Sequence, residues 1–171
     1  MLENVLLKVL ALILACVGGI VDLKVHKIPN KLTFFGMISG ILLNLILGGI
    51  NGALNSLAGI GIGFVAFLLF AIGALKAGDV KLYMAVGAIG GWKFCASAMI
   101  ASILAGGVVA FLVMLARKDS RNGFKHLWNY VLNMIYSRRF YMYQAESESS
   151  YFSFGCCIAL GTGIALFRYL N

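Results

Sequence analysis

The stretch "LKAGDVKLYM", residues 75–84, places Asp79 between two lysines and separates two strongly apolar segments. A carboxylate at the edge of a lipid bilayer loses much of its hydration, so its presence there needs a reason. Of the 171 residues in the chain, 61% are hydrophobic and 12% are charged, whereas soluble domains are about half apolar and about a quarter charged. The composition therefore predicts an all-α integral membrane protein.

Apolar segments continue on both sides of this stretch, and most are long enough to cross a bilayer as helices, which takes roughly 20 residues. A neutral turn, "GGINGA", separates the second segment from the third. The fourth is short, so we expect it to be tilted or sheltered by its neighbours. No linker divides the chain, and residues 1–171 are predicted to form one domain, a six-transmembrane helical bundle. The six segments are residues 2–21, 32–50, 54–75, 82–91, 94–116 and 151–170.

The first segment has an alternative interpretation as a cleaved signal peptide. Its n-region, "MLEN", carries an acid and no early cluster of positive charge. No small-x-small cleavage site follows it, so the sequence favours a retained span.

The basic residues gather in three of the predicted loops, which fall on one side of the membrane when six segments alternate. Cytoplasmic loops are enriched in lysine and arginine, so we expect a multi-pass protein of the cell membrane with both termini outside. The net charge of +8 is spread over separate loops, which argues against a nucleic-acid partner. The cytoplasmic set is Lys24, Lys27, Lys31, Lys76, Lys81, Arg117, Lys118, Arg121, Lys125, Arg138 and Arg139, and the opposite set is Lys93 and Arg168.

The longest polar connection, residues 117–150, contains "FKHLWNYVLNMIYSRRFYMY". Its aromatic and apolar residues recur at helical spacing, with basic residues between them. This pattern is typical of an interfacial helix, with Trp128 and the tyrosines in the headgroup region and basic side chains near anionic lipid. A solvated loop is the alternative.

Glycines lie inside the apolar segments, and two pairs have G-x-x-x-G spacing: Gly36 with Gly40, and Gly59 with Gly63. Small residues let helix backbones approach closely in lipid, where packing holds helices together. We expect these glycines to pack helices within the bundle, and association of two chains is the alternative.

The cysteines, Cys16, Cys95, Cys156 and Cys157, all fall in apolar runs and form no C-x-x-C pair. Cysteines in such runs are expected to be buried small hydrophobes. His26 and His126 are far from them in sequence. The pattern predicts no metal site, and we expect no cofactor.

Two of the six carboxylates need an explanation, because Glu3, Asp119, Glu146 and Glu148 lie near the N-terminus or in the polar connection. Asp22 directly follows the first span, and Asp79 lies between the third and fourth. The predicted topology puts both at the cytoplasmic end of the bundle. They could be ordinary boundary charges beside lysines. They could also form a carboxylate pair that shares a proton and activates water to attack a peptide bond.

Two motifs around these aspartates resemble those of a known family. "AGDVKLYMAVGAIGGW", residues 77–92, resembles the G-x-G-D-x-K-L segment of the type IV prepilin peptidases, which are membrane aspartyl proteases. "DLKVHKIPNKLT", residues 22–33, resembles their other signature, an aspartate followed by basic residues and I-P-N. The order of the motifs and the six-segment layout are also similar, so the resemblance covers nearly the whole chain.

The resemblance implies roles for individual residues. Asp22 and Asp79 would be the catalytic pair. Gly78, Lys81, Lys24 and Lys27 would support the site or bind substrate. Pro29 and Asn30 would set the start of the second span, because proline suits a first helical turn.

The sequence departs from the family pattern at two places. Lys76 replaces the first glycine of G-x-G-D, which predicts a less permissive loop before Asp79. The last span, "FSFGCCIALGTGIALF", lacks the proline often found near its start. The additional cytoplasmic segment with C-x-x-C motifs that larger, N-methylating members carry has no counterpart. The chain thus resembles the small, peptidase-only enzymes of tight-adherence (Flp) pilus systems or the archaeal preflagellin peptidases.

The resemblance implies a membrane aspartyl endopeptidase that removes the leader peptide of prepilin-like proteins on the cytoplasmic side. Its partners would be these substrates and the lipid bilayer. Two other classes stay open. One is a catalytically inactive membrane scaffold for pilus assembly, suggested by the change at Lys76. The other is a small proton-coupled transporter, although the chain shows no duplicated halves.

Overall fold

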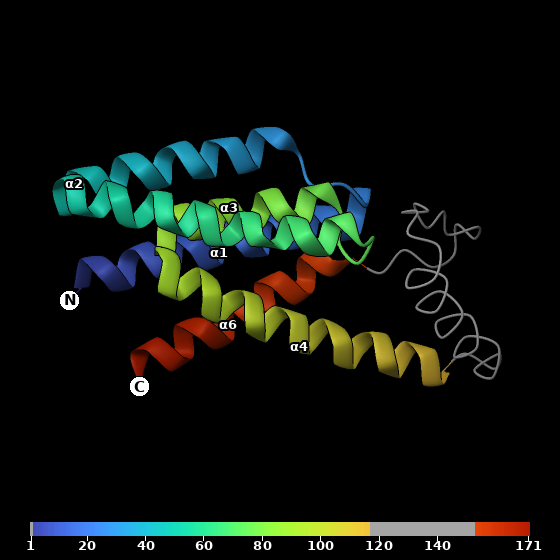
Figure 1. Cartoon of the computed structure of the whole chain (residues 1–171). Coiled ribbons are helices and arrows are strands. Elements are labelled where there is room, and N and C mark those ends of the chain that lie inside the picture. Colours follow the sequence, from blue (N-terminus) through green and yellow to red (C-terminus); the bar gives the residue numbers. More distant parts are fainter. Residues whose placement is uncertain (1, 117–152) are drawn as a thin grey trace.

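The computed structural model describes residues 2–116 and 153–171, which contain helices and no strand (Figure 1). The all-α prediction is therefore confirmed. Each of the six predicted segments coincides with helix over most of its length. The predicted interfacial helix lies outside the described residues. The helices are α1 (Leu2–Val25), α2 (Asn30–Ala71), α3 (Ala77–Gly90), α4 (Trp92–Ala116) and α6 (Phe154–Leu170).

Helix α2 consists of two antiparallel arms that meet at Gly49, within the predicted turn "GGINGA" (Figure 1). Gly49 has φ 59° and ψ −149°. Glycine adopts such a positive φ without the steric cost that a side chain would add. The arms, residues 30–48 and 50–71, lie side by side, and the Ser56 hydroxyl is 3.4 Å from the carbonyl oxygen of Gly40.

Helix α3 packs closely against both arms of α2 through glycines. A Cβ at Gly40 would lie 2.7 Å from the carbonyl carbon of Ala88, and one at Gly63 would lie 2.6 Å from the backbone nitrogen of Met84. At Gly59 it would overlap the carbonyl of Gly87. These glycines therefore bring backbones into contact within the bundle, as the G-x-x-x-G spacing predicts.

The last turn of α3 ends inside the bundle, where polar side chains of α2 complete its hydrogen bonds. The Asn44 amide donates to the carbonyls of Ala88 and Ile89 at 3.1 and 3.0 Å. The Ser56 hydroxyl donates to Ala88 at 2.6 Å. The final carbonyls of a helix have no partner within that helix, so a buried end needs such donors.

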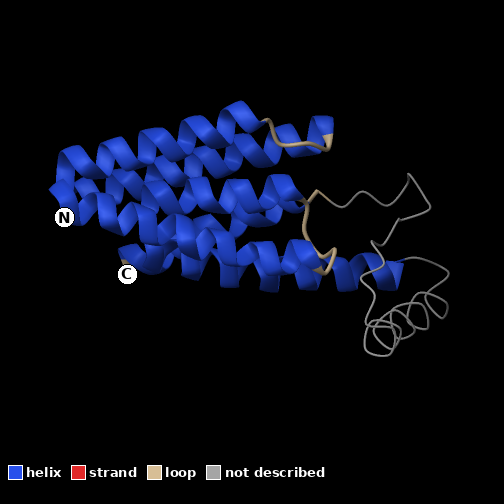
Figure 2. Cartoon of the chain, turned by 45° about the horizontal axis from the view of Figure 1, so that its top comes forward, coloured by secondary structure: helices blue, strands red, loops and turns tan. Residues whose placement is uncertain are grey.

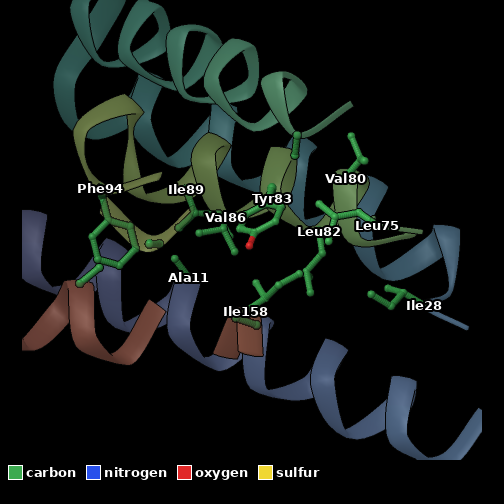
Figure 3. Close-up of a cluster of buried hydrophobic side chains, with 14 of the residues drawn as sticks. Ala11, Ile28, Leu75, Val80, Leu82, Tyr83, Val86, Ile89, Phe94 and Ile158 are labelled. Atoms are coloured by element: carbon green, nitrogen blue, oxygen red, sulfur yellow. The ribbon is translucent and has the colours of Figure 1, made fainter. Parts of the chain in front are cut away.

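The hydrophobic core surrounds α3 (Figure 3). Leu82, Tyr83 and Val86 are completely buried there. Ala11 of α1 and Ile158 of α6 face them (Figure 3). The shortest of the described helices thus occupies the centre of the bundle, and the longer ones surround it.

The outer surface of the bundle is apolar, as a lipid environment requires. Phe35, Ile46 and Phe167 are 72%, 76% and 70% exposed. By length and composition, three helices of the described residues could each cross a membrane: α1, α2 and α4. Helices α3 and α6 have 14 and 17 residues, fewer than the roughly 20 that a span perpendicular to the bilayer needs. The count of six spans therefore stays a prediction.

The prediction that all cysteines are buried is wrong for Cys16, which is exposed. Its neighbours on the same face of α1, Ile13, Val17 and Ile20, are also exposed, because this face points away from the other helices. Cys95 and Cys157 are buried, and Cys156 is half-buried.

The loops before α2 and α3 lie at one end of the bundle (Figure 1). Residues 26–29 and 72–76 and the start of α6 lie at this end, and both termini lie at the other (Figures 1 and 2). The end of α1 therefore meets the beginnings of α3 and α6.

Candidate active site

Asp22 lies in the last turn of α1 and is 1% exposed. The sequence placed it at the start of a loop, but α1 continues to Val25 because the backbone N–H of His26 still bonds to the Asp22 carbonyl at 2.8 Å. His26 then ends the helix with φ 53°. The carboxyl group of Asp22 is consequently held by a rigid element.

The Asp22 carboxyl group binds the first residues of α6. Its Oδ2 atom accepts hydrogen bonds from the Ser153 hydroxyl at 2.5 Å and from the Gly155 N–H at 3.2 Å. Ser153 is the N-cap residue of α6, but its hydroxyl makes no capping bond of its own. A side-chain oxygen at the N-cap normally accepts one of the first free N–H groups of a helix. Here Asp22, which belongs to α1, accepts one of these N–H groups, that of Gly155.

Close approach of two glycines makes this contact possible. A Cβ at Gly155 would lie 3.0 Å from the Cβ of Asp22 and 3.1 Å from the Cα of Gly19. A Cβ at Gly19 would lie 2.9 Å from the carbonyl oxygen of Gly155. Side chains at either position would separate α1 from α6 and move Asp22 away from its donors.

Asp79 is the third residue of α3 and is also 1% exposed. It therefore lies in a helix and not in the loop that the sequence suggested. Its Oδ2 atom accepts the backbone N–H of Lys76 at 2.9 Å. A carboxylate at this position of a first turn returns a hydrogen bond to the N-cap residue, and this bond holds the side chain in place.

Lys76 does not strain the segment before Asp79. Its φ of −90° and ψ of 155° are extended values that any residue adopts. The expectation that this lysine makes the loop less permissive is therefore not supported by the backbone. Its side chain is half-buried, and its charge acts on Asp79.

Asp22 and Asp79 line one cavity of about 220 Å³. The Oδ1 atom of each is buried and accepts no hydrogen bond from any residue in the described ranges. Each carboxyl group therefore has one bound oxygen and one oxygen left for another molecule. The cavity is lined by Asp22, His26, Lys27, Ile28, Asn30, Lys76, Ala77, Gly78, Asp79 and Lys81.

The surroundings favour the protonated form of Asp79. The pKa of this carboxyl group is raised from 3.8 to about 6, mainly by burial and also by the negative charge of Asp22. The Lys76 N–H and the Lys76 charge act in the opposite direction, but they do not compensate for burial. Two nearby carboxyl groups in this arrangement retain a proton between them at pH values where a free pair would lose it.

Lys81 joins the two sequence motifs. Its ammonium group donates to the side-chain oxygen of Asn30 at 2.9 Å, which connects α3 to the first residue of α2. Pro29, the N-cap residue of α2, has φ −65°. Its carbonyl accepts the Leu32 N–H at 3.1 Å. These contacts hold the loop between α1 and α2 beside Asp79.

The other residues singled out in the sequence differ in their positions. Gly78 lines the cavity, and a Cβ there would lie 3.2 Å from the Cβ of buried Ile28. Lys27 also lines the cavity. Lys24 is exposed in the last turn of α1 and is not part of the cavity wall. The structure therefore brings together all of the singled-out residues except Lys24 and Pro29.

Sequence reasoning missed Ser153, Gly155 and Gly19. Ser153 and Gly155 begin the last predicted span, which was considered only for its missing proline. The available signal was the position of Ser153 and Gly155, a polar and a small residue predicted to lie at the same membrane depth as the two aspartates. In residues 2–116 and 153–171, no three His, Cys, Asp or Glu side chains gather as metal ligands would.

Comparison with known proteins adds one finding. A family model described as the type IV leader peptidase family matches residues 9–111, which include Asp22 and Asp79 but not α6. No curated protein and no solved structure matches the chain.

Proposed function

Because the chain belongs to the type IV leader peptidase family, we propose that it is a membrane aspartyl endopeptidase that removes the leader of prepilin-like proteins. The observation that carries this proposal is the cavity in which Asp22 and Asp79 meet, each with one buried oxygen that accepts no hydrogen bond from the described residues. The aspartates are 57 positions apart in sequence (79 − 22) and come from different helices. Boundary charges would have no reason to be buried side by side in the wall of one cavity.

The proposed reaction uses a water molecule between the two carboxyl groups. The ionised carboxylate removes a proton from water as the water oxygen attacks the carbonyl carbon of the scissile bond. The protonated group donates its proton to the carbonyl oxygen. When the intermediate collapses, a proton passes to the amide nitrogen and the C–N bond breaks. The products are the carboxylate of the leader and the amine of the mature protein.

The cavity is proposed to lie at the cytoplasmic surface of the membrane. Its wall contains His26, Lys27, Lys76 and Lys81, and basic residues near a membrane surface stay on the cytoplasmic side and attract anionic headgroups. With α2 counted as two spans, the helices alternate so that both termini lie on the opposite side. A substrate whose apolar helix enters the bilayer beside the bundle would present its scissile bond to the cavity.

The scaffold alternative loses its main support, because Lys76 has an ordinary backbone conformation and contributes its N–H to Asp79. The transporter alternative requires a polar path through the bundle. Beyond the aspartates, the centre of the described bundle is filled by Leu82, Tyr83 and Val86. These contacts therefore favour the peptidase over both alternatives.

Exchanging either aspartate for asparagine tests the proposal. Asp22→Asn and Asp79→Asn are each expected to reduce leader removal at least about a thousandfold, because the two groups act as a unit. The assay co-expresses the chain with a small prepilin from the same genome and measures the shift in prepilin mass. Asp119→Asn is the matched control, because Asp119 lies outside the range 9–111 that matches the family.

Thermal unfolding in detergent shows whether the variants are folded. A folded variant of either aspartate that cleaves at the wild-type rate would contradict the proposed mechanism. Cleavage lost equally in Asp119→Asn would show that the loss does not depend on the carboxylate pair.

A further inference from the structure

We propose that Ser153 is a positioning residue that holds Asp22 as the ionised member of the pair, so that Asp22 acts as the base and Asp79 as the acid. This inference rests on the proposed peptidase function and assigns the two roles that the function leaves open. The residue lies outside the range that matches the family, and no sequence motif pointed to it.

The first argument is the hydrogen bond itself. Both Ser153 and Asp22 are buried, with 8% and 1% exposure, and the hydroxyl donates to Oδ2 at 2.5 Å. Hydrogen bonds from a hydroxyl to a carboxylate fall in this short range and are stronger than those between neutral groups. A low-dielectric environment strengthens them further. The contact therefore stabilises the negative charge on Asp22.

The second argument is the end of α6. The Gly155 N–H donates to the same Oδ2 atom at 3.2 Å. The N-terminus of a helix carries a partial positive charge, which favours an anion at this position. Because the Ser153 hydroxyl does not cap its own helix, both donors are directed to Asp22. A protonated carboxyl group would satisfy this end of α6 less well.

Asp79 has a weaker set of partners. One backbone N–H, that of Lys76, donates to its carboxyl group. The positive charge of Lys76 also favours the ionised form, but burial outweighs both effects and the pKa of Asp79 is raised to about 6. The pair is therefore asymmetric: two donors bind the Asp22 carboxylate, whereas burial lets Asp79 keep its proton up to about pH 6.

The other titratable groups around Asp22 come from each neighbouring element. His26 and Lys27 follow α1, Lys76 precedes α3, and Asp79 and Lys81 belong to α3. Cys156 of α6 also interacts electrostatically with Asp22. The Ser153 side chain also interacts with the Cys156 thiol, so Ser153→Ala removes this contact together with the donor to Asp22, and Ser153→Thr is the variant that keeps the hydroxyl.

The test compares Ser153→Ala with Ser153→Thr, which keeps the hydroxyl, and with Ser97→Ala as a matched control. The Ser97 hydroxyl is bonded to the Phe94 carbonyl of its own helix. Loss of a donor to a charged group predicts a kcat about 10- to 100-fold lower in Ser153→Ala. KM should stay within about twofold, because uniform substrate binding is unchanged.

The pH dependence separates positioning from a structural role. In Ser153→Ala the acidic side of the kcat profile should differ from that of the wild type, because the Asp22 carboxyl group has lost the hydroxyl that donates to it. Ser153→Thr should retain most of the wild-type kcat and the wild-type pH dependence of kcat. Ser97→Ala should match the wild type in both.

Two results would overturn the inference. One is a Ser153→Ala enzyme with the wild-type kcat and pH profile. The other is a Ser153→Thr enzyme as slow as Ser153→Ala with the same loss of thermal stability, which would reduce the residue to a structural role. An Asp22→Asn variant is assayed in parallel. If Asp22→Asn cleaves normally, the proposed function itself fails; if it is inactive, either result defeats the Ser153 role alone.

Discussion

Helix α3 differs sharply between its two ends. At its start, Asp79 is buried with one carboxyl oxygen that accepts no hydrogen bond from the described residues, and a cavity lies beside it. At its last turn, the carbonyls of Ala88 and Ile89 accept hydrogen bonds from Asn44, and glycines of α2 leave no room beside the backbone. The first end retains unsatisfied polar atoms, which lowers stability. The second end is hydrogen-bonded to α2 and closely packed, and it fixes the position of the first.

The largest effect on stability is expected where the packing is closest. Gly59→Val would place a side chain against the carbonyl of Gly87, and both helices would have to separate. We expect a loss of roughly 3 kcal/mol or more. Thermal unfolding in detergent measures it. Gly61→Val is the matched control on the same arm of α2, because a Cβ there meets nothing within 4 Å. Equal unfolding temperatures for the two variants would contradict the close contact.

At the other end of α3, removing the carboxyl group should increase stability. The folded protein holds the Asp79 proton up to its pKa of about 6, whereas the unfolded chain releases it near the ordinary pKa of 3.8. Between these values the folded state binds more protons, so stability falls as pH rises from about 4 to about 6. Asp79→Asn should remove this slope and be more stable at pH 7 by up to about 3 kcal/mol.

The measurement for this second prediction is thermal unfolding of the wild type and Asp79→Asn across that pH range. The variant should gain stability and lose cleavage together. If stability still fell with rising pH in Asp79→Asn as in the wild type, a group other than Asp79 would be responsible for the pH dependence.

The smallest effect is expected at the hydrogen bonds of the last turn. Asn44→Leu removes the donor to Ile89, while Ala88 keeps the Ser56 hydroxyl. One buried carbonyl without a partner predicts a loss of about 1–2 kcal/mol. Cleavage per folded molecule should keep its pH profile. Asn51→Leu, at an exposed position, is the control in thermal unfolding. An equally large loss of stability in this variant would show that the effect comes from introducing leucine and not from the lost hydrogen bond.

The same comparison explains how much could be predicted from the sequence. Apolar length and charge placement predicted the segments and put Asp22 and Asp79 at one end of the bundle, because both signals are local. Membership of the family is confirmed by the match over residues 9–111. The helix boundaries differ by a few residues, because hydrogen bonds of α1 and α3 continue into the polar stretches.

Other features depend on contacts between distant helices and could not be predicted. Asn44 and Ser56 lie inside apolar segments, where a single polar residue does not alter the hydrophobic pattern. Their partners are visible only once α3 lies between the arms of α2. Lys8 was also not considered. It is 8% exposed in α1, and its ammonium lies 3.4 Å from the centroid of the Tyr169 ring of α6.

The bond between Asp22 and the start of α6 also has a consequence for biosynthesis. Helix α1 is translated first, and α6 follows the other described helices along the chain. Asp22 therefore enters the membrane long before Ser153 and Gly155 leave the ribosome. The donors that would hold its charge arrive only with α6. A nascent chain that has both aspartates but not this helix lacks the geometry proposed for cleavage, so the order of translation itself delays the appearance of the peptidase.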